Sequence, residues 1–311
     1  MASFGDTDER DMISMIRGCI RKAPCDTDDD AAVIPVGRGD LVVCTDSVTF
    51  ERHKPEGMTF EQFGWMSAAV NMSDLAAMGA TPIGIVSALA LPKEMDTSDV
   101  CTIMTGMDEC AEFCGCHILG GDTKPGNGTV AVTALGVMEG RRPMTRKGAS
   151  PGDVIAVTGD LGAAAAGFLA LANGFDIPDA ISALCAPIPR IEEGRILSST
   201  GMVTSCIDLS DGLATAVNTI CSMNGCGAII EWDLLPRSPY VDDVCGRLGI
   251  GDREITIGWG GEYELLFTFD RKDAEALYDT GVEFSMIGLV TERDVVLHRD
   301  GKYEEIANGS Y

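Results

Sequence analysis

Apolar residues recur along the chain with two different periods, one typical of helices and one of strands. The stretch TFEQFGWMSAAVNMSDLAAMG, from Thr59 to Gly79, is mostly small and apolar with helical spacing. Thr59 and Gln62 have the spacing of a capping box, and Gly79 is placed to end the helix. The pattern predicts a long buried helix with Asn71 and Asp74 near its middle. Asp74 requires an explanation, because a buried carboxylate is costly unless it is paired or bound to a metal.

The rest of the chain predicts further helices and strands in alternation. Helices are expected at residues 9–22, 96–113 and 161–173, and on both sides of a strand at 205–211. Other strands are expected at 40–46, 83–92, 117–123, 129–138, 153–159, 227–232, 263–269 and 284–290. The order is not a strict β-α-β series, so the fold class predicted is α+β.

A polar segment divides these elements into two groups. Residues 140–153, GRRPMTRKGASPGD, are rich in Gly and Pro and hold four cations in an acidic protein. We place a domain boundary there, near Ala149. The expected organisation is two α/β domains, residues 1–148 and 149–311, with a mixed sheet in each.

Composition limits the class of protein. The 311 residues are 45% hydrophobic and carry a formal net charge of −25. This charge argues against a nucleic-acid partner, which requires a basic face. No apolar run reaches the roughly 18 residues of a membrane span, and the acidic start MASFGDTDERD does not read as a signal peptide. We expect a soluble, cytoplasmic protein without a membrane or nucleic-acid partner.

The twelve cysteines are scattered, with the densest group in CAEFCGCH. Cys110, Cys114, Cys116 and His117 leave a metal or iron–sulfur site open as an alternative. Their spacing contains no C-x-x-C pair, and Met107, Cys110 and Cys114 continue one face of a helix. We therefore favour reduced thiols packed in the core.

Aspartates carry the functional signal. They occur in five short motifs, four of which are expected to border a strand end or the start of a helix or turn. The motifs are DDDAAV, CTDS, NMSD, GGDT and IDLSDG, with Asp30, Asp46, Asp74, Asp122, Asp208 and Asp211. Several of them could simply cap helices. Capping does not explain Asp74, and gathered carboxylates are stable together only when they are protonated or neutralised. Mg²⁺ with oxygen ligands, serving a phosphate substrate, is the economical explanation.

Common phosphate-binding loops are not found in this sequence. GAAAAG, residues 162–167, has the glycines of a Walker loop, but Phe168 stands in the place of its lysine. We interpret this segment as a close-packed helix. The sequence thus indicates an ATP-using enzyme that relies on aspartate-bound metal instead of a P-loop.

Eight motifs, in order, resemble those of the thiamine-monophosphate kinase family. They are DDDAAV, VVCTDS, GWMSAAVNMSDLAAMGATP, GGDT, RKGASPGDVIAVTGDLG, PIPR, IDLSDGLA and GGEYELLF, and they span roughly residues 28–289. This family belongs to a superfamily of ATP-binding proteins that resemble aminoimidazole-ribonucleotide synthetase. The resemblance implies two α/β domains, a homodimer formed through the N-terminal domains, and direct phosphoryl transfer from ATP to thiamine monophosphate.

The resemblance also implies roles for individual residues. The Mg²⁺ ligands would be Asp30, Thr45, Asp46, Asp74, Asp122, Asp208 and Asp211, of which Asp30, Asp74 and Asp211 would be catalytic. The ATP contacts would be Gly121, Asp122, Arg146 and Ser210. The thiamine substrate would meet His53, Glu262 and Tyr311.

The chain departs from the family pattern at three places. The usual G-G-E-D-Y-E-L-L is shortened to GGEYELL around Glu262, Met104 stands where a tyrosine often lies, and only Tyr311 represents the aromatic C-terminus. Two alternatives stay open: another ATP-using member of the superfamily, such as one like aminoimidazole-ribonucleotide synthetase, and a non-catalytic paralogue that binds nucleotide.

Overall fold

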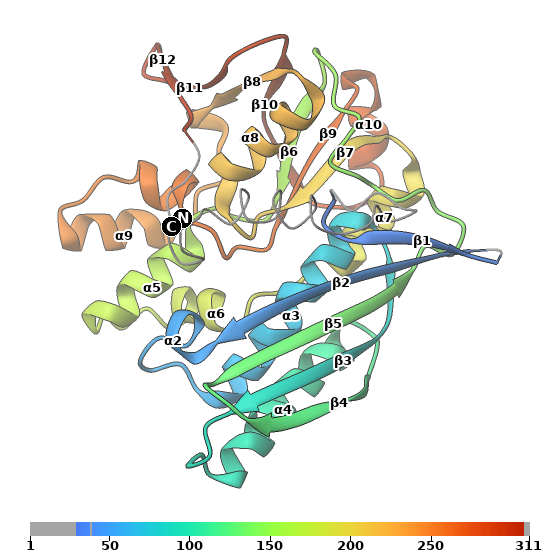
Figure 1. The fold of residues 1–311 in the computed structure, drawn as a ribbon. Coiled ribbons are helices and arrows are strands. Elements are labelled where there is room, and N and C mark those ends of the chain that lie inside the picture. The colour runs from blue at the N-terminus through green and yellow to red at the C-terminus, as the bar shows by residue number, and fades with distance from the viewer. Residues whose placement is uncertain (1–28, 38, 308–311) are drawn as a thin grey trace, which may run out of the picture.

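A computed structural model describes residues 29–37 and 39–307. The helix predicted at 9–22 and Tyr311 therefore lie outside the described residues. The described chain folds into two mixed sheets with helices, as the sequence predicts (Figure 1).

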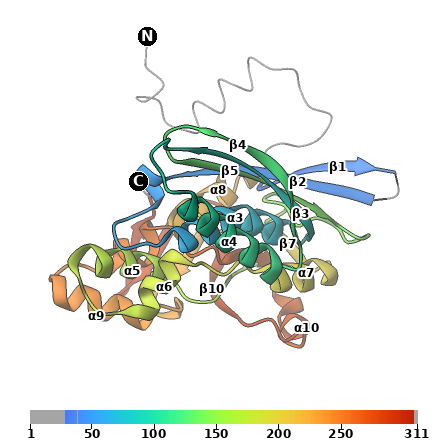
Figure 2. The ribbon, with the colours of Figure 1, turned by 90° about the horizontal axis from the view of Figure 1, so that it is seen from below.

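The first sheet has five strands in the order β1-β2-β5-β3-β4. Their bounds are β1 Ala32–Val36, β2 Gly39–Thr49, β5 Thr129–Val137, β3 Thr81–Leu91 and β4 Ile118–Pro125. Only β3 and β4 pair in parallel; the other neighbours are antiparallel. Helices α3, Phe60–Met78, and α4, Thr97–Phe113, lie on one face of this sheet (Figures 1 and 2). A short helix α2, Phe50–His53, follows β2 directly.

Helix α3 is the buried helix predicted from the sequence. Thr59 and Gln62 form the reciprocal capping box, and Gly79 ends the helix with a φ of 71°. Most α3 residues are buried, because the helix is surrounded by the first sheet, α4 and elements of the second half. Gly64 lets α4 approach closely, since a Cβ there would lie 1.9 Å from the carbonyl oxygen of Ile103.

The second sheet has seven strands in the order β12-β11-β8-β10-β6-β9-β7. Their bounds are β12 Lys302–Glu305, β11 Val295–Arg299, β8 Gly227–Glu231, β10 Phe284–Thr291, β6 Val154–Thr158, β9 Leu265–Phe269 and β7 Val203–Asp208. The helices of this half are α5 Ala163–Asn173, α6 Pro178–Cys185, α7 Ile191–Thr200, α8 Gly212–Asn224, α9 Pro239–Leu248 and α10 Ala274–Tyr278. Short helical turns are η2 Trp232–Leu234, η3 Glu254–Gly258 and η4 Arg271–Asp273.

Helix α5 contains the segment with the glycines of a Walker loop. Its Gly167 packs against α6, where an added Cβ would lie 2.1 Å from the carbonyl oxygen of Ala180. The interpretation of this segment as a close-packed helix is confirmed.

Two sequence predictions about secondary structure are wrong. Asp46 and Asp122 do not border strand ends but lie within β2 and β4. Both strands run further than predicted because the pairing of β2 with β5 continues to Thr49, and that of β3 with β4 continues to Pro125. Several further elements were not predicted, and most of them are short: β1, β11, β12, α2, α6, α9 and α10.

The cysteine-rich turn packs inside the first half of the molecule. Cys110, Cys114 and Cys116 are buried in the same hydrophobic cluster as α3. Within residues 29–37 and 39–307, no single helix is long and apolar enough to cross a membrane; only the pair α5 and α6, bent by 113°, meets that measure of length and composition.

Candidate active site

Three aspartates from distant parts of the chain meet between the two sheets. Asp30 lies just before β1, Asp74 lies in the middle of α3, and Asp208 is the last residue of β7. One carboxylate oxygen from each lies within 4.8 Å of the other two. Among the described residues this is the one group of acidic, His or Cys side chains that is arranged to hold a metal ion.

The three carboxylates are hard to keep ionised together. Asp30 and Asp208 are buried and Asp74 is half-buried. At an effective dielectric constant of about 20, two unit charges 4.8 Å apart repel by about 3.5 kcal/mol. Burial raises the pKa of Asp74 well above its usual range, and the charges of Asp208, Asp46 and Asp30 raise it further. Burial, with the charge of Asp30, raises the pKa of Asp208 to about 7.

Arg146 provides the positive charge of this cluster. Its Nη2 and Nε lie 2.5 and 3.2 Å from Oδ1 of Asp30. Burial raises the pKa of Asp30, and the charge and hydrogen bonds of Arg146 oppose that rise. The sequence-predicted ATP contact is therefore placed among the predicted metal ligands.

Two serines orient Asp208. Ser73 donates a hydrogen bond of 2.6 Å to Oδ2, and Ser210 donates one of 3.1 Å to Oδ1. Both hydrogen bonds lower the pKa of Asp208 and so favour its ionised form. Ser210 was predicted as a site residue, whereas Ser73 was not. The position of Ser73 next to Asp74 in the NMSD motif was the available signal.

Asp46 and Asp211 form the outer part of the site. The backbone N–H of Asp46 donates to Oδ1 of Asn71 at 2.9 Å, which ties β2 to the middle of α3. Burial raises the pKa of Asp46, while a hydrogen bond with Asp74 lowers it and the charge of Asp211 raises it. Asp211 precedes α8, and its side chain does not cap that helix. The capping explanation therefore fails for Asp211.

The donor set of the three aspartates fits a hard divalent cation. Oδ2 of Asp30 is buried without a hydrogen-bond partner, so it has a lone pair to offer. The ligand atoms are all carboxylate oxygens, which Mg²⁺ prefers, and Ser73 and Ser210 provide the outer hydrogen bonds that orient such ligands.

Three predicted residues lie elsewhere. Thr45, Gly121 and Asp122 belong to the first sheet, where Asp122 is exposed and forms an ion pair of 2.6 Å with Lys124. Asp122 is aligned with Ala88 and Ala131 on the sheet face opposite α3. Gly121 and Asp122 line a hollow there, and the Thr45 hydroxyl donates to the carbonyl oxygen of Val132. The structure does not bring these residues to the aspartate cluster of their own chain.

Two of the predicted substrate residues, His53 and Glu262, are among the described residues, one in each half of the molecule. His53 ends α2, where its Nδ1 accepts the N–H of Thr49 at 3.0 Å, and burial lowers its pKa. Glu262 is buried, and its Oε1 accepts the N–H of Gly162 at the start of α5. Burial raises the pKa of Glu262 to about 8.

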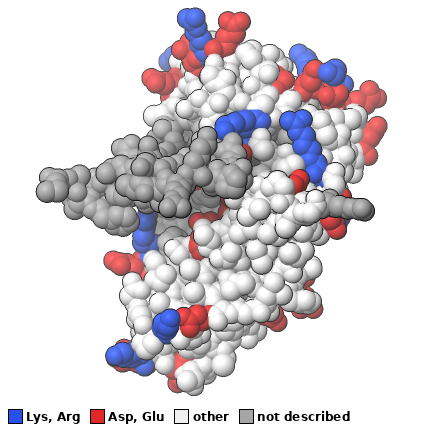
Figure 3. Space-filling view, turned by 45° about the vertical axis from the view of Figure 1, so that its right-hand side comes forward, with Lys and Arg blue, Asp and Glu red and all other residues white. Residues whose placement is uncertain are grey.

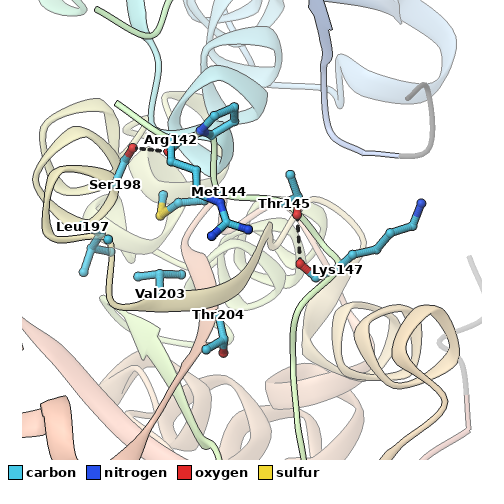
Figure 4. A pocket seen from close by; sticks show the side chains of 10 residues that line it. Arg142, Met144, Thr145, Lys147, Leu197, Ser198, Val203 and Thr204 are labelled. Carbon is cyan, nitrogen blue, oxygen red and sulfur yellow. Dashed lines mark hydrogen bonds between the residues drawn. The ribbon is translucent and has the colours of Figure 1, made fainter. Parts of the chain in front are cut away.

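A small pocket lies beside the polar segment that joins the two halves. Figure 4 shows Arg142, Thr145 and Lys147 of this segment opposite Leu197, Val203 and Thr204. The hydroxyl of Ser198 donates to the carbonyl oxygen of Arg142, and that of Thr145 donates to the carbonyl oxygen of Lys147 (Figure 4). Both hydroxyls are thus engaged with backbone carbonyl oxygens, and the residues that line the pocket include the neighbours of Arg146, Thr145 and Lys147.

Comparison with known proteins relates both halves of the chain to the superfamily that the sequence motifs resemble. The family models for AIR synthase related protein match the chain with their N-terminal domain at residues 28–138 and their C-terminal domain at residues 150–299. A thiamine-monophosphate kinase of Methanospirillum hungatei is 33% identical over 92% of this chain and 93% of its own. One of Synechococcus elongatus is 37% identical over 89% and 88%.

Solved structures of similar proteins superpose over nearly the whole chain. The structure described as AaThiL complexed with AMPPCP and TMP has a TM-score of 0.89 at 26% identity and covers 99% of this chain and 98% of that one. Thiamine monophosphate kinase from Aquifex aeolicus has a TM-score of 0.83 at 26% identity, with 96% and 100% covered. The fold and the aspartate cluster thus define a two-domain protein of the class related to AIR synthase. Within this class, the chain belongs to the thiamine-monophosphate kinase family.

Proposed function

We propose that this protein transfers the γ-phosphoryl group of ATP to the phosphate of thiamine monophosphate, which gives thiamine diphosphate and ADP. The observation that carries the proposal is the meeting of Asp30, Asp74 and Asp208 next to Arg146. The relatives named as thiamine-monophosphate kinases, and the similar structure whose description names an ATP analogue and TMP, support the choice of substrates.

Each group at the site has a role in this reaction. Asp30, Asp74 and Asp208 would hold Mg²⁺, with Asp46 and Asp211 close by. Bound Mg²⁺ supplies the positive charge that lets two phosphate-bearing substrates approach. Arg146 adds a fixed guanidinium with geometry suited to phosphate oxygens. The accepting phosphate oxygen is already anionic, so positioning and charge neutralisation suffice without a general base.

The direct test is incubation of the protein with ATP, Mg²⁺ and thiamine monophosphate, with thiamine diphosphate measured by chromatography. We expect thiamine diphosphate and ADP in equal amounts, and none when EDTA removes the metal. Free thiamine should not be phosphorylated. ATP binding without thiamine diphosphate would contradict the proposal and favour another ATP-using enzyme of the class or a non-catalytic paralogue.

We further propose a homodimer formed through the face of the first sheet that lies opposite α3 and α4 and that no described helix covers (Figure 2). In Figure 3 the surface over this part of the molecule is largely without charged side chains, although the protein carries a net charge of −25. Strands of this sheet expose Val36, Ile83, Val86 and Leu119 to solvent. An apolar face on so acidic a protein supports self-association.

The same arrangement offers a role to Asp122. It lies three strands from Asp46, about 14 Å across the sheet, on the face opposite α3. We propose that Gly121 and Asp122 act at the boundary between two copies, in the site of the partner subunit.

Mixing two inactive variants tests this arrangement. If Asp122 serves the partner's site, each mixed dimer of Asp74→Asn and Asp122→Ala subunits has one intact site. Unfolding and refolding an equal mixture should then restore about a quarter of the wild-type activity, because half of the dimers are mixed. No gain over the separate variants would contradict action across the interface.

The domain division and the location are also part of the proposal. The two sheets and the separate matches at 28–138 and 150–299 support a division at residues 148 and 149. A cytoplasmic location and the lack of a nucleic-acid partner stay predictions from composition and charge.

A further inference from the structure

The backbone on either side of Lys147 is held by one side chain from the second half of the molecule, that of Asn224. Asn224 is the last residue of α8. Its Nδ2 donates to the carbonyl oxygen of Arg146 at 2.8 Å, and its Oδ1 accepts the N–H of Gly148 at 2.7 Å. One amide therefore brackets the backbone on both sides of Lys147.

The hydrogen bonds determine the orientation of this amide. The second hydrogen of Nδ2 goes to the carbonyl oxygen of Ile220 at 2.8 Å. The nitrogen thus meets two carbonyl oxygens and the oxygen meets an N–H, so a flipped amide would lose all three bonds. This pattern requires two donor hydrogens and a separate acceptor atom on the same short side chain, which among acyclic side chains only an amide supplies.

The bracketed backbone belongs to the arginine that pairs with Asp30. The N–H of Arg146 donates to Oδ1 of Asp29 at 2.5 Å, and its guanidinium lies on Asp30. Beside it, the carbonyl oxygen of Thr145 accepts the N–H of Cys206 in β7, two residues before Asp208. The backbone of Arg146 is therefore fixed between α8, β7 and the acidic residues before β1.

Gly148 makes the bracket possible. Its φ is 134°, and an added Cβ would lie 2.1 Å from the carbonyl oxygen of Thr204. The segment passes so close to β7 that only glycine fits, and Asn224 holds it there by the Gly148 N–H. Helix α8 begins directly after Asp211, so one helix links the IDLSDG motif at its N-terminal end to Arg146 at its C-terminal end.

We infer that Asn224 is a positioning residue for Arg146, and that it acts on ATP through the placement of that guanidinium. This inference rests on the proposed function. Asn224 itself faces only backbone groups of Arg146, Gly148 and Ile220, so it does not touch the aspartate cluster.

A double-mutant cycle separates positioning from simple stability. Asn224→Ala should lower kcat/KM for ATP about tenfold and leave KM for thiamine monophosphate unchanged. Arg146→Ala should lower kcat/KM for ATP more strongly. In the Arg146→Ala background, the further effect of Asn224→Ala should vanish, because the group that it positions is gone. Equal effects of Asn224→Ala in both backgrounds would overturn the inference.

The chain offers a matched control on the same helix. The Nδ2 of Asn218 donates to the carbonyl oxygens of Ala214 and Ile306, at 2.9 Å each, and does not reach the segment of Arg146. Asn218→Ala removes two comparable hydrogen bonds and should leave kcat/KM for ATP within about twofold of the wild type. The same tenfold loss in Asn218→Ala would show that general loosening of α8 is responsible, and would overturn the inference.

Hydrogen exchange distinguishes failure of this inference from failure of the proposed function. In Asn224→Ala, amides of the peptide that covers residues 144–150 should exchange at least tenfold faster, and in Asn218→Ala they should exchange as in the wild type. This readout needs no substrate, so it holds even if the wild-type protein makes no thiamine diphosphate. Unchanged exchange in Asn224→Ala would overturn the inference whatever the activity assay shows.

Discussion

Ser73 of α3 donates a hydrogen bond of 2.6 Å to Asp208 at the end of β7. These residues are 135 positions apart, and the bond joins the long helix of the first half to β7, an edge strand of the second sheet. Both side chains are buried. The bond therefore orients one predicted metal ligand, Asp208, and its donor lies on the helix that carries another predicted ligand, Asp74.

Removing this hydroxyl should weaken the binding of Mg²⁺. In Ser73→Ala, one oxygen of Asp208 loses a charge-assisted hydrogen bond, worth about 1.5–3 kcal/mol. The pKa of Asp208, already raised to about 7, should rise further, so fewer molecules hold the carboxylate ionised at neutral pH. We expect the Mg²⁺ concentration for half-maximal activity to rise about tenfold or more, measured by titrating activity with MgCl₂.

Ser67 provides the control for this variant. It is a buried serine on the same helix, but its hydroxyl donates to the carbonyl oxygen of Gly64 within that helix. Ser67→Ala should leave the Mg²⁺ requirement unchanged. An unchanged requirement in Ser73→Ala would show that Asp208 does not need this bond.

Asp74→Asn should separate activity from folding. The amide removes a ligand charge, so we expect kcat to fall at least about 100-fold. It also removes like-charge repulsion from Asp208, Asp46 and Asp30, so the metal-free protein should unfold at the same or a higher temperature. Thermal unfolding in EDTA and a kinase assay with Mg²⁺ measure the two effects.

Asp108→Asn is the matched control, because Asp108 is exposed on α4 and distant in sequence from every aspartate motif. It should retain full activity. A fully active Asp74→Asn would rule out the metal role of Asp74, and an unfolded one would make Asp74 a structural residue.

The sequence predicted the long helix, and marked Asp74 within it as unusual, for physical reasons that are local. The capping box and Gly79 determine where α3 begins and ends, and each of these signals involves only residues that are close together in the sequence. A carboxylate among small apolar residues is likewise recognisable from the helix alone. The resemblance to the kinase family implies that Asp30, Asp74 and Asp208 share a site, and the structure brings these three together.

Residues on the first sheet were harder to place. Strand β4 lies at the sheet edge and is exposed from Leu119 to Pro125, so it lacks the alternation that tells one face from the other. GGDT consequently gave no sign that Asp122 turns away from α3. Ser73 and Asn224 were missed for a different reason: each bonds a residue more than 70 positions away, and no local pattern shows such a partner.

The contact between α3 and α4 depends on two glycines. A Cβ at Gly106 of α4 would lie 1.9 Å from the carbonyl oxygen of Glu61, just as one at Gly64 would meet Ile103. Because backbone cannot give way as a flexible side chain can, Gly106→Ala should lower the free energy of unfolding by at least about 2 kcal/mol. Urea unfolding followed by circular dichroism measures this change.

Gly246 of α9 is the control, since an added Cβ there meets no atom within 4 Å. Gly246→Ala should leave stability equal or raise it by up to about 1 kcal/mol, as alanine does within a helix. If Gly106→Ala had the same free energy of unfolding as Gly246→Ala, α3 and α4 would not approach as closely as the structure shows.

Glu262 should make the stability of the metal-free protein depend on pH. Burial raises its pKa from the usual 4.5 to about 8, so between these values the folded protein keeps a proton that the unfolded chain has released. Stability from this group is therefore present below about pH 4.5 and is lost as the pH rises towards 8, by up to about 5 kcal/mol.

In EDTA, the midpoint of thermal unfolding should fall across this window in the wild type and fall less steeply in Glu262→Gln, which carries no titrating proton. Glu56→Gln, at an exposed glutamate, should keep the wild-type slope, because the aspartate cluster titrates equally in both proteins. Equal slopes in all three proteins would mean that Glu262 is ionised throughout, and that its carboxylate meets a cation or enough N–H donors to offset its burial.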